Sequence, residues 1–404
     1  MSEWKKVSMK DNLEILTGYA FSSKNFNEEE GIPLIRIRDL ETHNPVTLYK
    51  GDYDDKYIIN KGDILVGMDG EFNIVRWKGP KALLNQRVAK INSKNPNIIS
   101  EDFIFYRLQG ELREIEVLTP ATTVKHLSKK DIEDLNLLLP PLGEQSKIAS
   151  ILSSVDEAIE KTEAIIEQTE KVKKGLMQQL LTKGIGHTKF KKTEIGEIPE
   201  EWEVKSISEV AKVVSGGTPS KQISEYWENG TIPWATPTDI TSNDNKYIST
   251  TQLMITESGL RNSSANLLPK GSVLMTSRAT IGPRCINTVP MATNQGFKSF
   301  ICDPDVLHNE YLYYLIDKIK DQFIALASGS TFLEISKSAV ETFKIPVPPL
   351  EEQIEIAKML SSLDEKLSVE KVKKESLQTI KKALMQVLLT GKVRVKVDNE
   401  VMSQ

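Results

Sequence analysis

Two stretches of the chain combine basic and amide side chains and contain no carboxylate. Residues 72–100 hold six basic residues and no acidic one, and residues 258–302 hold five basic residues and no acidic one. Each stretch contains an Asn-Gln pair, which begins at Asn85 in the first and at Asn294 in the second. Arginine, lysine, asparagine and glutamine side chains contact the phosphates and base edges of DNA. The two stretches therefore predict surfaces that bind a polyanion, with nucleic acid as the ligand.

The predicted DNA contacts are basic and amide side chains from both stretches. They are Arg76, Lys78, Gln86, Arg87, Arg278, Arg284, Asn294, Gln295 and Lys298. The alternative is that the stretches are buried strands, which exclude carboxylates because a buried charge is costly, and that the Asn-Gln pairs are structural turns. Composition favours neither interpretation over the other.

The regions around these stretches are not basic overall. Residues 1–139 contain 20 basic and 22 acidic residues, residues 202–347 contain 13 and 14, and the whole chain has a net charge of −4. A basic domain is the usual footprint of a DNA-binding protein. A locally positive surface on an acidic protein can still attract DNA selectively. We therefore expect the isolated chain to bind DNA weakly until partner subunits complete the surface.

Sequence patterns for catalysis are absent. No GxxxxGK[ST] phosphate loop occurs, and the glycine-rich segment 215–220 lacks the GxGxxG spacing of a dinucleotide site. The Pro-Pro pairs are followed by leucine, not by the aromatic residue of an amino-methylase motif. The four histidines are scattered, and none has a cysteine or histidine at metal-ligand spacing. We therefore expect no catalytic residue and no metal site in this chain.

Composition limits the class of protein. A length of 404 residues predicts two or three domains, and 39% hydrophobic with 27% charged residues is typical of a soluble globular protein. No run of about 18 apolar residues could span a membrane. The chain has two cysteines and no apolar signal-peptide core at its start. These features predict a cytoplasmic location and no membrane contact.

An internal repeat organises the rest of the sequence. Residues 140–184 match residues 348–392 at a constant offset of 208 over 45 residues, without a gap. The match sets PPLGEQSKIASILSSVDEAI against PPLEEQIEIAKMLSSLDEKL, and LMQQLLT against LMQVLLT. Weaker similarity continues upstream, where the Asn-Gln pair recurs at an offset of 209. The sequence therefore predicts two copies of an α/β domain, each followed by a long helix.

Apolar residues recur at alternating spacings of four and three in both repeated segments, which is typical of a coiled-coil seam. The predicted interface residues are Ile148, Leu152, Val155, Ile159, Ile166, Ile356, Leu360, Leu363, Leu367 and Leu384. In the second segment the pattern lapses at Glu370, Lys374 and Lys381. We expect the seam to shift there toward Val369, Val372 and Ile380. A helix of this length is ~60 Å long and cannot bury an apolar stripe by itself.

We therefore expect the two helices to pack against each other. The alternative is that each helix packs separately on its own globular domain. The predicted organisation is a globular domain at 1–139, a helix at 140–184, a polar linker at 185–201, a second domain at 202–347, a second helix at 348–392 and a short tail at 393–404.

Several motifs together resemble one known family. They are the doubled PPLxEQxxIAxxLSSxD and LMQxLLT, and, in the second domain, SGGTPSK, YWENGTIPWATPTDI, SRATIGP and ATNQGF. The first domain carries the divergent forms GYAFSSKNF, GIPLIRIRDL and LNQRV. This set, in order and over nearly the whole chain, resembles the specificity (S) subunit of type I restriction–modification enzymes.

The resemblance implies two target-recognition domains, each of which binds one half of a bipartite, asymmetric sequence in double-stranded DNA. It implies two long helices packed as an antiparallel coiled coil with internal pseudo-two-fold symmetry. It also implies assembly with two methylation (M) subunits and with restriction (R) subunits. S-adenosylmethionine, ATP and Mg²⁺ are then expected on these partners, and this chain has no cofactor of its own.

Two other functions are compatible with parts of the sequence. A coiled-coil adaptor that binds proteins through its globular ends, without DNA specificity, is the main alternative. An enzyme that acts alone is the third, and it has no supporting motif.

Overall fold

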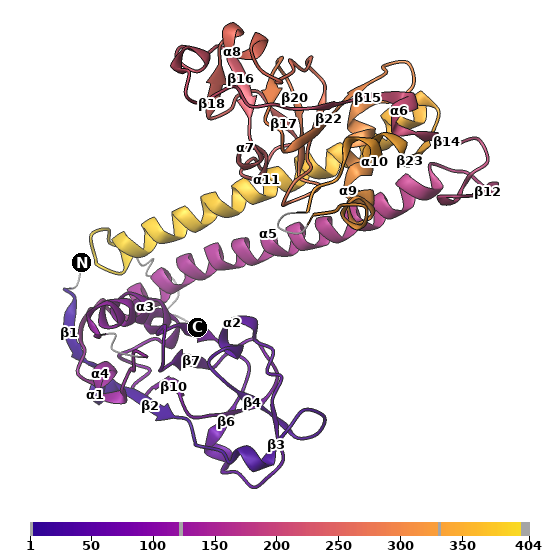
Figure 1. The fold of residues 1–404 in the computed structure, drawn as a ribbon. Helices are drawn as coiled ribbons and strands as arrows, with labels where there is room; N and C mark the ends of the chain where they lie inside the picture. Colours follow the sequence, from indigo (N-terminus) through magenta and orange to yellow (C-terminus); the bar gives the residue numbers. More distant parts are fainter. Residues whose placement is uncertain (1–2, 121–123, 330–332, 397–404) are drawn as a thin grey trace. The chain divides into compact units, whose positions relative to one another are not determined.

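The computed structural model describes residues 3–120, 124–329 and 333–396 (Figure 1). The chain divides into two units, of which the first comprises Met1–Glu163 and Val372–Gln404 and the second Ala164–Lys371. Each unit contains one globular domain together with one half of each of two long helices. Among the described residues, no helix has the length and apolarity needed to cross a membrane.

The domain of the first unit has three antiparallel or mixed sheets and one long helix, α3 (Glu101–Leu118). Its central sheet has the order β2-β10-β7-β8, formed by Leu13–Thr17, Val88–Ser93, Ile64–Gly67 and Ile74–Arg76. A second sheet has the order β3-β5-β4-β9-β6, formed by Phe26–Asn27, Leu48–Tyr49, Ile32–Ile35, Ala82–Leu84 and Ile58–Ile59. The third pairs β1 (Lys5–Ser8) with β11 (Asn136–Leu139). The short helices are α1 (Met9–Asn12), α2 (Asp39–Thr42) and α4 (Lys129–Glu133).

The domain of the second unit also has a central sheet, a second sheet and a strand pair, with different numbers of strands in the first two. Its central sheet is β15-β22-β19-β20-β17, formed by Ala211–Ser215, Phe297–Cys302, Val273–Thr276, Arg284–Asn287 and Tyr247–Ile248. A three-stranded sheet is β18-β16-β21, formed by Leu253–Ile255, Ile232–Ala235 and Ala292–Thr293. β14 (Glu203–Ser206) pairs with β23 (Lys344–Val347). The helices are α6 (Ile207–Val210), α7 (Pro237–Thr241), α8 (Glu257–Arg261), α9 (Asn309–Ala325) and α10 (Lys337–Thr342).

The Pro-Pro-Leu-x-Glu-Gln segments start the two long helices, α5 (Leu142–Lys183) and α11 (Leu350–Leu388). Gln145 accepts a hydrogen bond from the backbone N–H of Ser100 at 2.9 Å, and Ser100 caps the N-terminus of α3. Gln353 accepts the equivalent bond at 2.8 Å from the backbone N–H of His308, which precedes α9. The repeated glutamine therefore ties each long helix to the long helix of the adjacent domain.

The repeated glutamate binds the segment that follows the other long helix. In the first unit, Glu144 accepts hydrogen bonds from Arg394 at 2.8 and 2.7 Å. In the second unit, Glu352 accepts them from the backbone N–H of Ile185 at 2.9 Å and from the indole of Trp202 at 2.9 Å. The described part of the tail, up to residue 396, is thus held in the first unit as the linker is held in the second.

The two helices pack against each other within each unit, so the alternative of separate packing is wrong. In the first unit, Ile148 and Leu152 of α5 share one core cluster with Leu384 and Leu388 of α11. In the second unit, Ile356 and Leu360 of α11 share a cluster with residues 176–181 of α5. The helices pair the start of one with the end of the other, which makes them antiparallel (Figure 1). Val155, Ile159, Ile166 and Leu363 are half-buried along the same seam, and Leu367 is buried.

The predicted shift of the seam in α11 is wrong. Val369, Val372 and Ile380 are 65%, 60% and 48% exposed, and the charged positions face the partner helix instead. Lys374 pairs with Glu163 at 2.9 Å and Lys381 pairs with Asp156 at 2.6 Å, all in the first unit. The second unit contains the equivalent pair Lys173–Asp364. Opposite charges on facing helices allow these polar side chains to remain in the seam.

The predicted polar linker at 185–201 contains regular structure. Residues 190–193 and 196–199 form the hairpin of β12 (Phe190–Thr193) and β13 (Gly196–Pro199). Ile198 is 3% exposed and belongs to the core of the second unit, against which Ile185 and Ile195 also pack. Apolar residues spaced among the polar ones thus attach the segment to the domain.

Candidate nucleic-acid interface

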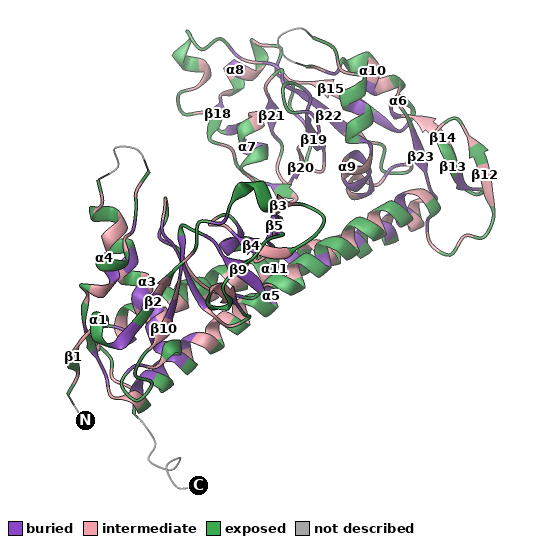
Figure 2. Cartoon of the chain, turned by 90° about the horizontal axis from the view of Figure 1, so that it is seen from below, coloured by how far each residue is buried: buried purple, intermediate pink, exposed green. Residues whose placement is uncertain are grey.

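Each carboxylate-free stretch contains buried β-strand residues. The first stretch contains β8, β9 and β10, and the second contains β19 to β22 (Figure 2). The four residues of β19 and the two of β21 are all buried. The alternative interpretation of the composition therefore accounts for the buried strand residues in both stretches. Any DNA contacts must come from the loops between these strands.

Arg76 on β8 and Arg284 on β20 each contact the long helix of their own domain. Arg76 pairs with Asp102 at 2.6 Å and lies 5.4 Å from the ring centre of Phe105. Arg284 pairs with Asp317 at 3.1 Å, donates to the carbonyl of Tyr313 and is only 11% exposed. These contacts join sheet to helix. They argue against direct DNA contact by Arg284.

The two predicted lysines also contact protein groups. Lys78 pairs with Glu160 of α5 at 2.6 Å and is half exposed. Lys298 is 4% exposed, and its ammonium lies 3.3 Å from Glu334 and 3.4 Å from Ser277. The burial of Lys298 argues against a phosphate contact.

The remaining five predicted residues, Gln86, Arg87, Arg278, Asn294 and Gln295, lie in one loop cluster per domain. In the first domain the loop cluster comprises residues 17–19, 68–70, 85–87 and 125–127, and in the second domain residues 215–217, 277–279, 294–296 and 333–335. The sequence analysis matched only the Asn-Gln segment of one loop cluster with that of the other. The structure shows that three further segments lie around the Asn-Gln segment in each domain.

The same backbone hydrogen bonds connect the segments of both loop clusters. Met68 donates to the carbonyl of Arg87 at 2.8 Å, as Ser277 donates to that of Gly296 at 2.8 Å. Residue 70 donates to the carbonyl of residue 125 at 2.9 Å, and residue 279 donates to that of 333 at 2.9 Å. Residue 19 donates to residue 84 at 3.0 Å, and residue 217 donates to residue 293 at 2.9 Å. The two loop clusters are therefore copies of one backbone arrangement.

Glycine is required where the first segment meets the Asn-Gln loop. A Cβ at Gly18 would lie 2.0 Å from the carbonyl oxygen of Asn85, and a Cβ at Gly216 would lie 2.0 Å from that of Asn294. Asn85 is 7% exposed and Asn294 bonds the backbone N–H of Gly296 at 2.8 Å. Asn294 thus acts as a turn residue and Asn85 is buried, whereas the glutamines that follow both asparagines are exposed.

An ionic group occupies the first loop cluster. Asp69 lies 3.3 Å from Nε of Arg87 and 2.6 Å from Nδ1 of His126. In the second loop cluster, Glu334 lies 3.8 Å from Nε of Arg278 and 3.3 Å from Nζ of Lys298.

The sequence does not point to Asp69, His126 or Glu334, because all three lie outside the two carboxylate-free stretches. The repeat offset could have found them, since Asp69 aligns with Arg278 and His126 aligns with Glu334. Isolated β-bridges join the same positions, Asp69 with His126 and Arg278 with Glu334.

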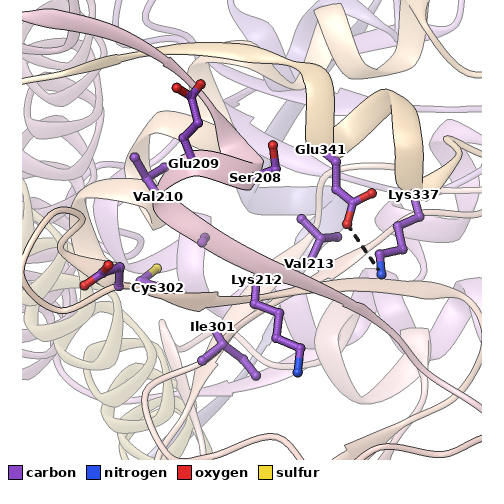
Figure 3. Close-up of a pocket in the computed structure, with 11 residues that line it drawn as sticks. Ser208, Glu209, Val210, Lys212, Val213, Ile301, Cys302, Lys337 and Glu341 are labelled. Carbon is purple, nitrogen blue, oxygen red and sulfur yellow. Dashed lines mark ion pairs between the residues drawn. The ribbon is translucent and has the colours of Figure 1, made fainter.

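A separate hollow of about 510 Å³ lies among α6, β15, β22 and α10 of the second unit (Figure 3). Lys337 and Glu341, one turn apart on α10, pair at 3.4 Å at its edge. Burial raises the pKa of the Cys302 thiol to about 12, so this thiol stays protonated and is a poor nucleophile. The lining residues therefore bring no nucleophile and base together. Among the described residues, no group of three or more His, Cys, Asp or Glu side chains could hold a metal ion.

Two copies of one α/β domain, each with a polar loop cluster and paired long helices, define a duplicated recognition protein. A family model described as the type I restriction modification DNA specificity domain matches residues 1–171 and 199–379. The chain belongs to this family, as the sequence motifs predicted.

Individual relatives agree with this assignment. The type I restriction enzyme MjaVIII specificity subunit of Methanocaldococcus jannaschii is 33% identical, over 84% of this chain and 81% of the relative. The putative MjaX specificity subunit of the same organism is 30% identical, over 98% of this chain and 94% of the relative. The crystal structure of a type I restriction–modification S subunit from M. genitalium has the same fold, with a TM-score of 0.60, 18% identity and 95% and 96% coverage of the two chains.

The family defines the role of the chain in general terms. Its members are non-catalytic DNA-recognition subunits that assemble with methylation and restriction subunits. The chain is therefore a specificity subunit and not an enzyme by itself.

Proposed function

We propose that each domain reads one half of a bipartite DNA sequence through its loop cluster. The observation that carries this proposal is the pair of loop clusters, which share their backbone hydrogen bonds and differ in their side chains. Gln86 and Arg87 stand where the second domain has Gln295 and Gly296. An identical scaffold with different polar side chains can bind two different half-sites, unlike a homodimer, which reads a palindrome.

We further propose that the chain binds two methylation subunits and works in the cytoplasm. The pseudo-two-fold repeat supports two equivalent binding positions, because each unit contains the same combination of domain and helix halves. The two cysteines are both free, which suits a reducing compartment. S-adenosylmethionine, ATP and Mg²⁺ belong to the partner subunits in this proposal. The target adenine must leave the base stack to be methylated, and the methylation subunits would hold it.

A domain exchange tests the assignment of half-sites. Residues 1–139 are replaced by the corresponding domain of another family member, and the complex with methylation subunits selects sequences from a random DNA library. We expect one half-site of the selected sequence to change and the other to stay the same. A change in both half-sites would contradict the proposal. If the unaltered complex selects no sequence at all, the proposed reading of half-sites is refuted.

A further inference from the structure

We propose that Arg87 and Arg278 each read a guanine, and that Asp69 and Glu334 are positioning residues that aim them. This inference rests on the proposed function, because it assumes that each domain binds a half-site. It identifies one base pair in each half-site that a single arginine determines.

In the first domain, Arg87 is exposed and contacts Asp69 and His126. Asp69 contacts it through two atom pairs, Nε to Oδ2 at 3.3 Å and Nη1 to Oδ1 at 3.4 Å. Nδ1 of His126 lies 3.4 Å from Nη1 of the same guanidinium. The side chain of Arg87 remains 54% exposed, while that of Asp69 is only 23% exposed. The carboxylate thus lies behind an accessible guanidinium.

The backbone of Arg87 supports a functional role. Its φ angle is 74°, a left-handed conformation that is unfavourable for a residue with a Cβ. The aligned residue in the second domain, Gly296, does not adopt this conformation. Unfavourable backbone conformations persist mainly where function requires them.

The second domain has an arginine–carboxylate pair with the positions exchanged. Arg278 occupies the place of Asp69 in the bridge between segments, and Glu334 occupies the place of His126. The side chain of Arg278 is 47% exposed. Glu334 also contacts the buried Lys298, which fixes the carboxylate in turn. Each domain therefore presents one carboxylate-held arginine, from a different loop.

A carboxylate next to each arginine favours a base over a phosphate as the ligand. A phosphate contact would place two anions on one guanidinium, and the carboxylate would weaken it. A fixed guanidinium can instead donate two parallel hydrogen bonds to O6 and N7 of guanine, because its planar fork matches these acceptors. Gln86 precedes Arg87 and is exposed, and Gln295 is exposed and accepts a hydrogen bond from the hydroxyl of Thr218. Glutamine makes the matching contact with adenine.

The test compares one variant of Arg87 and two of Asp69, in the complex with methylation subunits. Binding is measured to the DNA sequence that the unaltered complex selects and to its single-base-pair variants. Arg87→Lys keeps the positive charge but removes the planar guanidinium that donates two parallel hydrogen bonds. Asp69→Asn keeps the shape of the side chain but removes the negative charge that pairs with Arg87. We expect either change to lower discrimination at one guanine position by about tenfold or more, within one half-site only. Asp69→Glu should restore most of the discrimination.

The second domain provides the parallel test and the control. Arg278→Lys should relax one position in the other half-site. Arg261→Lys is the matched control, because Arg261 pairs with Glu257 at 3.4 Å in the same domain but outside the loop cluster. It should leave the sequence preference unchanged.

The binding strength and base preference of the variants separate base reading from phosphate binding. If Arg87 binds phosphate, Asp69→Asn strengthens binding to all sequences and Arg87→Lys leaves the base preference intact, and either result would overturn the inference. Thermal unfolding of each variant identifies a folding defect. If an Asp69 variant fails to fold, the base preference of Arg87→Lys, which retains the ion pair, tests the proposal. A complex without any sequence preference would instead refute the proposed function itself.

Discussion

Arg76 and Arg284 illustrate why a residue type does not reveal its role at the scale of a single side chain. Both lie in carboxylate-free stretches and both are arginines, as DNA contacts often are. Both nevertheless pack on an aromatic residue of the adjacent helix, Phe105 for the first and Tyr313 for the second. Their ion pairs are made with carboxylates outside the stretches, so composition gives no sign of them.

Loss of Arg284 should therefore affect stability more than DNA binding. Arg284→Gln removes a nearly buried guanidinium from Asp317 and from the carbonyl of Tyr313. We expect the second domain to lose about 2 kcal/mol of unfolding free energy, as for hydrogen bonds to charged groups. Urea unfolding measures this loss. The salt dependence of DNA binding should not change, whereas a slope reduced by about one would show a lost phosphate contact.

At the scale of elements, the end of α11 matters for the first domain. Glu144 is 3% exposed and is paired with Arg394, which holds the pKa of its carboxyl below the usual range. Burying a carboxylate without a partner is costly. The segment after α11 is therefore a structural part of the first domain and not a dispensable extension.

A truncation tests this role of the tail. A chain that ends at residue 392 lacks Arg394, and we expect the first domain to lose about 3 kcal/mol of stability at neutral pH. A chain that ends at residue 396 retains Arg394 and is the matched control.

The contribution of the Glu144–Arg394 pair to stability depends on pH in a defined direction. The paired carboxylate has a lowered pKa, so its contribution is present at neutral pH and is lost as the pH falls through that pKa. The difference between the two truncated chains should therefore shrink in acid. A difference that is absent at pH 7, or that grows in acid, would contradict this account of the tail.

The charged residues in the seam define the register of the helix pair. Lys381–Asp156 and Lys173–Asp364 are related by the repeat offset, and each aspartate also accepts a hydrogen bond from a tyrosine of the adjacent domain, Tyr106 at 2.7 Å or Tyr314 at 2.6 Å. A slip of one heptad would separate all of these partners. Polar seam residues that specify register at a cost in stability are known in coiled coils.

At the scale of the whole molecule, the two helices are each continuous through both units. Their length should therefore influence the spacing of the half-sites. Deleting residues 157–163 together with the equivalent residues 365–371 shortens both helices by one heptad, or ~10 Å. We expect the selected DNA sequence to keep both half-sites and to change the number of bases between them.

Deletion of residues 365–371 alone is the corresponding control. It moves Lys374 and Lys381 by one heptad relative to their partners on α5, so we expect assembly to fail. If the double deletion leaves the gap unchanged while the complex still binds, the helices do not set the spacing.

The sequence alone determined the repeat, the two long helices and most of the seam. These features depend on periodicity and on proline and glycine positions, which are local along the chain. The recurrence of an Asn-Gln pair at the repeat offset also selected Gln86 and Gln295 as candidate DNA contacts, which stays a prediction. The family resemblance rested on the same local motifs.

The tertiary structure decided which basic side chains are exposed and which are buried in ion pairs within the protein. Lys298 and Arg284 are basic residues in the right stretch, yet their partners Glu334 and Asp317 come from segments 36 and 33 residues away. Asp69 and His126 meet Arg87 only because three loops converge through backbone hydrogen bonds. The burial and pairing of a charge depend on which distant segments the fold brings together, and sequence spacing carries no such information.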